Sequence, residues 1–186
     1  MDGTTATGTA SQTPNMTRPD ASEHAAYYGK YIALVPGNEI MRALESQGRE
    51  TAQMLASLSE SQGAHRYAPG KWSVKEVIGH VADSERIFAY RALRIARGDR
   101  TPIEGFEQDD YVRGAEFDRL TVADLLAEYK SVREATLRLF GCLQPEAWTR
   151  RGIANKNEVS VRALAYMIAG HELHHRQILR EKYGVG

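Results

Sequence analysis

The sequence contains almost no cysteine: Cys142 stands alone among 186 residues, so no disulfide can form within the chain. An excess of positive charge is also missing, because 24 lysines and arginines balance 24 aspartates and glutamates. No apolar run approaches the roughly 20 residues of a membrane-spanning helix, and the N-terminus lacks the basic and apolar blocks of a secretory signal. These absences favour a cytoplasmic protein that binds neither nucleic acid nor a membrane.

Several enzyme motifs and structural patterns are missing as well. We find no glycine-rich phosphate loop and no Gly-x-Ser-x-Gly nucleophile motif. We also find no internal repeat and no alternating pattern typical of a β-strand, and residues 150–158 read as a polar loop. Cys142 is flanked by small and apolar residues, and we interpret it as a small buried side chain rather than a nucleophile.

The chain divides into a short tail and one domain. Residues 1–22 contain mainly small and polar residues, which bury too little surface to offset the entropy lost on ordering, so we predict a disordered tail. Residues 23–186 are expected to form a single domain. Its first part, residues 27–35, is rich in tyrosine and aliphatic residues. We expect this part to pack on the body as an irregular segment, or alternatively to contact a dimer partner.

Four segments have the apolar spacing of amphipathic helices, and capping residues precede them. The expected helices run over about Glu39 to Leu58, Val74 to about Arg97, 122–140, and Val161 to about Tyr183. They predict an all-α fold, a four-helix bundle with a long loop between helices two and three. That loop, residues 98–120, either covers a site at the end of the bundle or is a simple crossover.

The fourth predicted helix contains the sequence His171-Glu172-Leu173-His174-His175, which matches the His-Glu-x-x-His pattern. At about 100° per residue, His171 and His175 face the apolar side of this helix, whereas His174 points away from it. Two imidazoles four residues apart on an apolar face favour a metal ion, because protonated rings would repel each other.

The third ligand cannot follow the arrangement of zinc proteases, in which it lies downstream. Only eleven residues follow His175, and none is a histidine. Upstream, His80 is the one other histidine on a helix that faces the predicted core, whereas His24 and His65 lie in tail or loop sequence and are treated as solvated. The residues therefore predict a site of three imidazoles, which leaves a coordination position for water or substrate.

Residues 72–86 and 169–175, which carry these histidines, resemble the DinB-like superfamily. This superfamily includes DNA-damage-inducible proteins of unknown activity, bacillithiol transferases and mycothiol-dependent maleylpyruvate isomerases. The resemblance spans about Tyr27 to Tyr183 and implies a four-helix bundle that binds a divalent metal, commonly nickel or zinc, and often forms a homodimer. The metal ligands that it implies are His80, His171 and His175.

We therefore expect a metal-dependent enzyme that acts on a small molecule. The leading interpretation is transfer of a low-molecular-weight thiol to an electrophile, since a bound metal lowers the pKa of a thiol. The first alternative is a hydrolase that activates water, and the second is a metal-binding stress-response protein without catalytic activity.

Other charged and polar residues are candidates for supporting roles. Glu172 is expected to orient a ligand imidazole by a hydrogen bond or to act as a base. Arg91 is a candidate to bind a substrate carboxylate or to form a surface ion pair, and Tyr111 is a further candidate in the long loop. Glu85 lies at the edge of an apolar stripe, so it must be paired or reach water.

Overall fold

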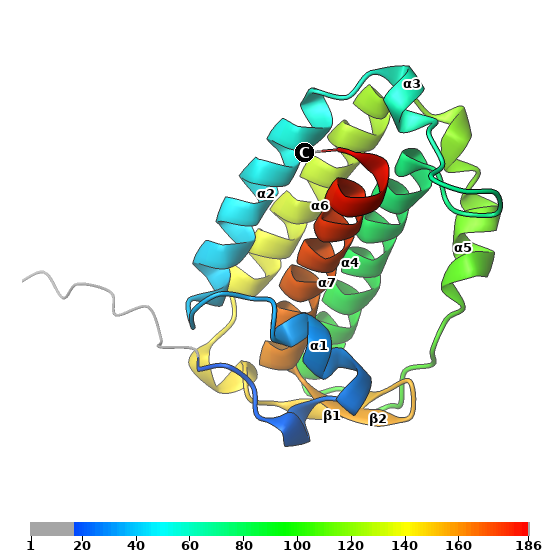
Figure 1. Ribbon diagram of the computed structural model, residues 1–186. Coiled ribbons are helices and arrows are strands. Elements are labelled where there is room, and N and C mark those ends of the chain that lie inside the picture. The colour runs from blue at the N-terminus through cyan, green and yellow to red at the C-terminus, as the bar shows by residue number, and fades with distance from the viewer. Residues whose placement is uncertain (1–16, 186) are drawn as a thin grey trace, which may run out of the picture.

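Four long helices form the body of the protein in a computed structural model that describes residues 17–185 (Figure 1). The fold class predicted from the sequence is confirmed. The helices α4, α6 and α7 begin at the predicted residues and end within one residue of the predicted ends, whereas α2 begins one residue later than predicted and ends two residues earlier. Their bounds are α2 (Ile40–Ala56), α4 (Val74–Ala96), α6 (Val122–Gly141) and α7 (Val161–Tyr183).

Local sequence fixes the start of the two helices that carry the histidines. Ser73 Oγ accepts a hydrogen bond from the Glu76 amide at 3.0 Å, and the Glu76 carboxylate accepts one from the Ser73 amide at 2.7 Å. Ser160 Oγ accepts from the Ala163 amide at 3.0 Å at the start of α7. Each cap satisfies amides that the helix leaves free and contributes about 1 kcal/mol.

A buried polar layer divides the apolar core into two clusters. One cluster contains Phe88 and the first half of α7, and the other contains Val74 and Leu179. Between them lie buried polar side chains from all four long helices, including the following: Gln47, Thr51, His80, Ser84, Glu85, Arg133, Thr136, His171, Glu172 and His175. This layer places the predicted ligands at mid-height in the bundle.

Glu85 is paired within this layer, as its position at the edge of an apolar stripe required. Arg133 Nε and Nη2 donate to the two carboxylate oxygens of Glu85 at 2.9 and 2.7 Å. The same Nη2 donates to Glu172 at 2.6 Å, and Nη1 donates to the Leu44 carbonyl at 2.9 Å. One guanidinium therefore joins α6 to α4, α7 and α2.

The segment before α2 packs on the bundle, as predicted, but it is helical rather than irregular. It contains two 3₁₀ turns, η1 (Ala21–Glu23) and η2 (Ala26–Tyr28), and the one-turn helix α1 (Gly29–Ile32). In Figure 1 this segment crosses the lower half of α7. Gly170 permits the crossing, because a Cβ atom there would lie 2.0 Å from the Tyr31 carbonyl oxygen.

The predicted N-terminal tail includes residues 1–16, which lie outside the described residues, and residues 17–22, which are described and packed on the domain. The Arg18 guanidinium donates to the carbonyls of Ile32 and Val35. These contacts are hydrogen bonds and bury few apolar side chains, so apolar composition alone does not reveal them. The boundary predicted at residue 22 therefore lies too far along the chain.

The connection between α4 and α6 is long, as predicted, but it is not a loop throughout. It contains α5 (Gln108–Ala115) and a 3₁₀ turn, η3 (Phe117–Arg119), and it runs beside α4 (Figure 1). Val112 is the only buried residue of α5, so the helix is too short and too polar to show a clear periodic pattern. Its packing on α4 stabilises it, and that is a tertiary effect.

A small hairpin replaces the polar loop that was predicted at residues 150–158. Strands β1 (Arg151–Ala154) and β2 (Asn157–Ser160) pair antiparallel, and Asn155 and Lys156 between them have positive φ angles of 47° and 63°. Such a pair is typical of a type I′ turn. Each strand has four residues, which is too short for an alternating pattern to stand out.

The remaining elements are short. Helix α3 (Glu60–Gly63) follows α2, and η4 (Pro145–Ala147) forms a single turn after α6. Cys142 is exposed rather than buried, and it directly follows the last residue of α6. None of the helices in residues 17–185 is long and apolar enough to cross a membrane.

Gly170→Ala should lower the free energy of unfolding by about 2 kcal/mol or more, because the added methyl group collides with backbone atoms of α1. Gly114→Ala is the matched control, since nothing lies within 4 Å of a Cβ atom at that helical position. Urea unfolding of the two variants measures the difference. Equal stability of both variants would contradict the close contact between the α1 backbone and Gly170 of α7.

Candidate metal centre

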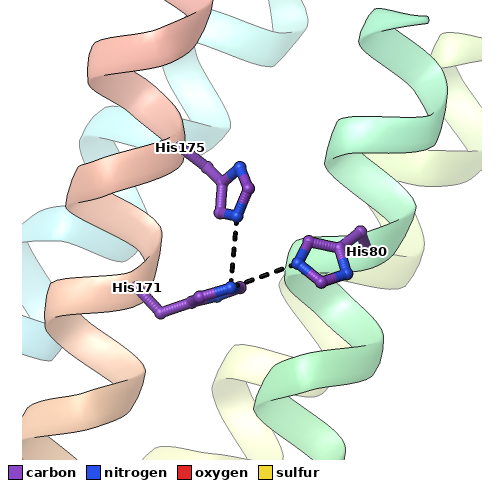
Figure 2. A group of neighbouring side chains, drawn as sticks. All are labelled: His80, His171 and His175. Atoms are coloured by element: carbon purple, nitrogen blue, oxygen red, sulfur yellow. Dashed lines mark hydrogen bonds between the residues drawn. The ribbon is translucent and has the colours of Figure 1, made fainter. Parts of the chain in front are cut away.

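His80, His171 and His175 converge in the polar layer, as the sequence predicted (Figure 2). His171 Nε2 lies 3.1 Å from His80 Nε2 and 3.2 Å from His175 Nε2. One possible ligand nitrogen from each ring lies within 4.8 Å of the other two. Residues 91 positions apart in the sequence are thus brought together by the packing of α4 against α7.

Aromatic side chains enclose these rings and keep them from water. The Trp72 ring centroid lies 4.8 Å from that of His80, and the Tyr31 ring meets the edge of His171 at 5.5 Å. Phe88 lies 6.1 Å from His171 on the other side. The exposed fractions of the three histidines are therefore only 3%, 7% and 9% in chain order.

Burial keeps the three histidines uncharged at neutral pH. It lowers the pKa of His80 to about 4 and that of His175 to about 3. The pKa of His171 also lies well below its ordinary value, first because of burial and then because of its three histidine neighbours. Neutral imidazoles keep a nitrogen lone pair free, which is the form that binds a metal ion.

Two of the three nitrogen separations match those around a divalent metal ion. Nitrogens about 2.0–2.1 Å from one ion are about 3.3 Å apart at tetrahedral angles and about 2.9 Å apart at octahedral angles. The two Nε2 separations of 3.1 and 3.2 Å lie between these values. His175 Nδ1 is buried and has no hydrogen-bond partner in the described chain, so no protein bond commits this ring to another role.

A cleft of about 420 Å³ leads from the surface to His175. Its walls come from the segment that contains α1, from the loop before α4, from the start of α5 and from the second half of α7. Five aromatic residues line it: Tyr27, Tyr31, Tyr67, Trp72 and Tyr183. This volume is in the range of small-molecule sites, about 300–1,000 Å³.

The connection between α4 and α6 contributes Gln108 and Asp109 to this cleft. Of the two interpretations of residues 98–120, the one in which they cover a site therefore agrees with the structure. Burial lowers the pKa of His80, and the negative charge of Asp109 opposes that shift, so the carboxylate lies close enough to influence the cluster. The sequence analysis missed Asp109, because nothing in the run Gln108-Asp109-Asp110 shows which side chain faces the histidines.

Glu172 points away from the histidine rings. One carboxylate oxygen accepts hydrogen bonds from Thr51 Oγ1 and from the Tyr129 hydroxyl, the latter at 2.7 Å. The other oxygen accepts from Arg133 at 2.6 Å. In residues 17–185 the Glu172 carboxylate makes no hydrogen bond with a histidine. The contacts expected of Glu172, either as a partner of an imidazole or as a base beside the cluster, are therefore not formed.

Arg91 and Tyr111 lie away from the cleft. Arg91 is only 2% exposed, so it is not the surface ion-pair partner considered from the sequence, and its Nη2 donates to the Glu104 carbonyl at 3.0 Å. It follows His80 by three turns of α4, about 16 Å along the axis. Tyr111 is 49% exposed and packs on Phe106. Neither side chain lines the cleft in the described structure.

The other histidines lie outside the cluster. His174 is partly buried in the cleft wall, beside Tyr31, which agrees with its expected peripheral position. His65 is exposed, as expected, whereas His24 is partly buried and its Nδ1 lies 3.0 Å from the Ala25 carbonyl oxygen.

Comparison with known proteins identifies relatives of this bundle. Residues 43–179 match the sequence profile of the DinB superfamily. A curated protein of Oceanobacillus iheyensis, named "Putative metal-dependent hydrolase OB0413", is 24% identical over 140 residues, which make up 74% of this chain and 80% of that protein.

Two solved structures share the fold. YfiT from Bacillus subtilis, described as "a probable metal-dependent hydrolase with an unusual four-helix bundle topology", has a TM-score of 0.69 at 18% identity and covers 90% of this chain and 94% of its own. A mycothiol-dependent maleylpyruvate isomerase has a TM-score of 0.65 at 13% identity, with 83% of this chain and 63% of that chain covered. At these identities the likeness concerns the fold.

The free energy of unfolding of the metal-free protein should fall as the pH is lowered from about 6.5 to about 4. The unfolded chain takes up protons on His80 and His175 near pH 6.5, whereas the folded chain, with pKa values of about 4 and about 3, does not. The loss is on the order of 3 kcal/mol per ring, and neither ring contributes to it well above pH 6.5.

Urea unfolding in the presence of a chelator measures this loss. The double variant His80→Gln/His175→Gln is the control, and its stability should depend less on pH across the same interval. Identical pH profiles for wild type and variant would contradict the buried, neutral state of the rings.

Glu172→Gln should retain metal binding but lower the free energy of unfolding by about 1–3 kcal/mol. The carboxylate accepts hydrogen bonds from Thr51, Tyr129 and Arg133. The NH₂ group of a glutamine amide cannot accept, so at least one of these hydrogen bonds would be lost. The exposed Glu181→Gln on the same helix is the control and should change stability by less than about 0.5 kcal/mol. Loss of metal with unchanged stability would instead place Glu172 in the metal centre.

Proposed function

Because the chain belongs to the DinB superfamily, we propose that His80, His171 and His175 bind a divalent metal ion that activates a nucleophile in the adjoining cleft. Imidazole ligands suit zinc and nickel, and we propose one of these two metals. The convergence of three neutral, buried rings supports the proposal.

We propose that the nucleophile is a low-molecular-weight thiol, which the enzyme transfers to an electrophile. A divalent metal at this site supplies a Lewis acid that lowers the pKa of a coordinated thiol or water. The ordinary pKa of a thiol is about 8.5 and that of water about 15.7, so the pKa of a thiol must be lowered far less to give an anion at neutral pH. A site without a base in contact with its ligands therefore suits a thiol better.

The observation that carries this choice is the bonding of Glu172. Its carboxylate is fully engaged by Thr51, Tyr129 and Arg133, and no carboxylate in residues 17–185 makes a hydrogen bond or ion pair with His80, His171 or His175. The chain's own contribution would be to hold the rings in place, exclude water with Trp72 and Tyr31, and position the electrophile in the cleft. A mycothiol-dependent enzyme has the same fold.

Hydrolysis is the second candidate, and Asp109 favours it. Its exposed carboxylate lines the cleft together with His175 and influences the pKa of His80. From that position it could accept a proton from an attacking water, whose oxygen would bond to the substrate as the bond to the leaving group breaks, and the proton would then pass to the leaving group. The names given to the Oceanobacillus and Bacillus relatives agree with this chemistry.

Replacing one cluster histidine should abolish stoichiometric metal binding. His175→Ala removes a ligand atom, whereas His174→Ala removes the neighbouring ring, which lines the cleft but lies outside the cluster. Elemental analysis after loading with zinc or nickel should give about one ion per chain for wild type and His174→Ala, and almost none for His175→Ala. Wild-type protein without bound metal would overturn the proposal.

The loaded protein should then consume a haloarene only when a thiol is supplied, and Asp109→Asn should retain at least about half of this activity. Turnover in water alone that falls at least about tenfold in Asp109→Asn would establish the hydrolase instead. Bound metal without turnover of either kind would favour the non-enzymatic alternative and contradict both candidates. Mass spectrometry of the products distinguishes a thioether from a hydrolysis product.

A further inference from the structure

The cleft that leads to His175 carries an excess of positive charge. Lys30 and Lys71 line it, and Asp109 is the only carboxylate among the residues that do. The cleft therefore differs from the chain as a whole, in which positive and negative side chains are equal in number. A local excess of one charge in a concave, partly apolar site concentrates ligands of the opposite charge.

Lys30 is held in place by tyrosines and not by a carboxylate. Its Nζ lies 4.2 Å from the Tyr27 ring centroid and 4.9 Å from that of Tyr31. The two tyrosine hydroxyls are 3.0 Å apart and the rings meet edge to face at 82°, so both rings contact the same ammonium group. Cation–π contacts fix the position of a charge without neutralising it, which leaves Lys30 free to pair with a ligand.

Lys71 occupies the wall formed by the loop before α4. It precedes Trp72, whose ring packs on His80, and within residues 17–185 its ammonium group pairs with no carboxylate. By contrast, Lys75 in the first turn of α4 pairs with Glu60 at 2.7 Å. The two unpaired lysines thus line the cleft from different parts of the chain.

Aromatic side chains also line the cleft. Tyr67 and Tyr183 meet edge to face at 4.9 Å, and the Tyr183 hydroxyl donates to the Trp72 carbonyl at 2.7 Å. This bond fixes the ring beside the mouth of the cleft. Such walls suit a flat or apolar group, whereas the two ammonium groups suit an anion.

We propose that this cleft selects small molecules that carry a carboxylate beside an apolar or aromatic body, with Lys30 and Lys71 as the specificity-determining residues. The carboxylate lies between the two ammonium groups, and the reacting end of the molecule extends toward His175. The inference rests on the proposed function, because it concerns the ligand of the same site. Either the thiol or the electrophile can carry the carboxylate.

Binding to metal-free protein tests the selectivity without any reaction. Isothermal titration with 3-phenylpropionate and with its neutral amide should show tighter binding of the carboxylate. Lys30→Met and Lys71→Met should each weaken carboxylate binding about three- to fivefold and leave amide binding unchanged. Asp109→Asn should strengthen carboxylate binding about twofold. Lys130→Met, which alters an exposed lysine on α6 remote from the cleft, is the matched control and should have no effect.

Turnover by the metal-loaded protein shows which substrate carries the carboxylate. The thiol arm compares 3-mercaptopropionate with 2-mercaptoethanol, and the electrophile arm compares 4-chloro-3,5-dinitrobenzoate with 1-chloro-2,4-dinitrobenzene. In the comparison that involves the substrate carrying the carboxylate, the lysine variants should raise KM for the charged compound about three- to fivefold with little change in kcat.

Equal binding of carboxylate and amide, or no detectable binding of either, would overturn the inference. So would an effect of Lys130→Met as large as that of the cleft variants. Metal content is measured separately: a chain that prefers the carboxylate but binds no metal would refute the proposed function and leave the selectivity of the cleft standing.

Discussion

The bonding of Arg133 is the interaction on which the geometry of the metal centre depends. This guanidinium holds Glu85 of α4, Glu172 of α7 and the Leu44 carbonyl of α2. It therefore fixes the position of α4 along the axis of α7, and this position decides whether His80 lies opposite His171. Gly48 makes room for it, since a Cβ atom there would lie 3.0 Å from Arg133 Cγ. Removing Arg133 leaves two buried carboxylates uncompensated and costs about 3–5 kcal/mol.

The charged side chains of the polar layer and those of the cleft have different roles. In the layer every carboxylate oxygen of Glu85 and Glu172 accepts a hydrogen bond, so these groups hold the helices in register. The side chains at the cleft, Lys30, Lys71 and Asp109, are exposed and lack ion-pair partners in the described chain. Structural charge is thus buried and paired, whereas charge that is available to a ligand lies at the surface of the same site.

Helical phase and capping residues were enough to predict the bundle and to place His171 and His175 together, because both depend on local patterns. His80 was predicted as the one other histidine on a core-facing helix and by the resemblance to the superfamily. Ser73 and Ser160 mark the helix starts, and the four-residue spacing of His171 and His175 puts them on one face. Asp109, the hairpin and the orientation of Glu172 could not be predicted in this way. Asp109 lies on a helix that only tertiary packing stabilises, and Glu172 is oriented by Arg133, which is 39 residues away in the sequence.

The crossing of α1 over Gly170 has a consequence for how this fold diversifies. The superfamily profile begins at residue 43, yet Tyr27, Lys30 and Tyr31, which form one wall of the cleft, precede it. The histidines, Lys71 and Asp109 lie inside the segment that matches the profile. Because Tyr31 packs on His171 and leaves no room for a Cβ atom at residue 170, a change of substrate through the N-terminal segment is limited to replacements that keep this close contact.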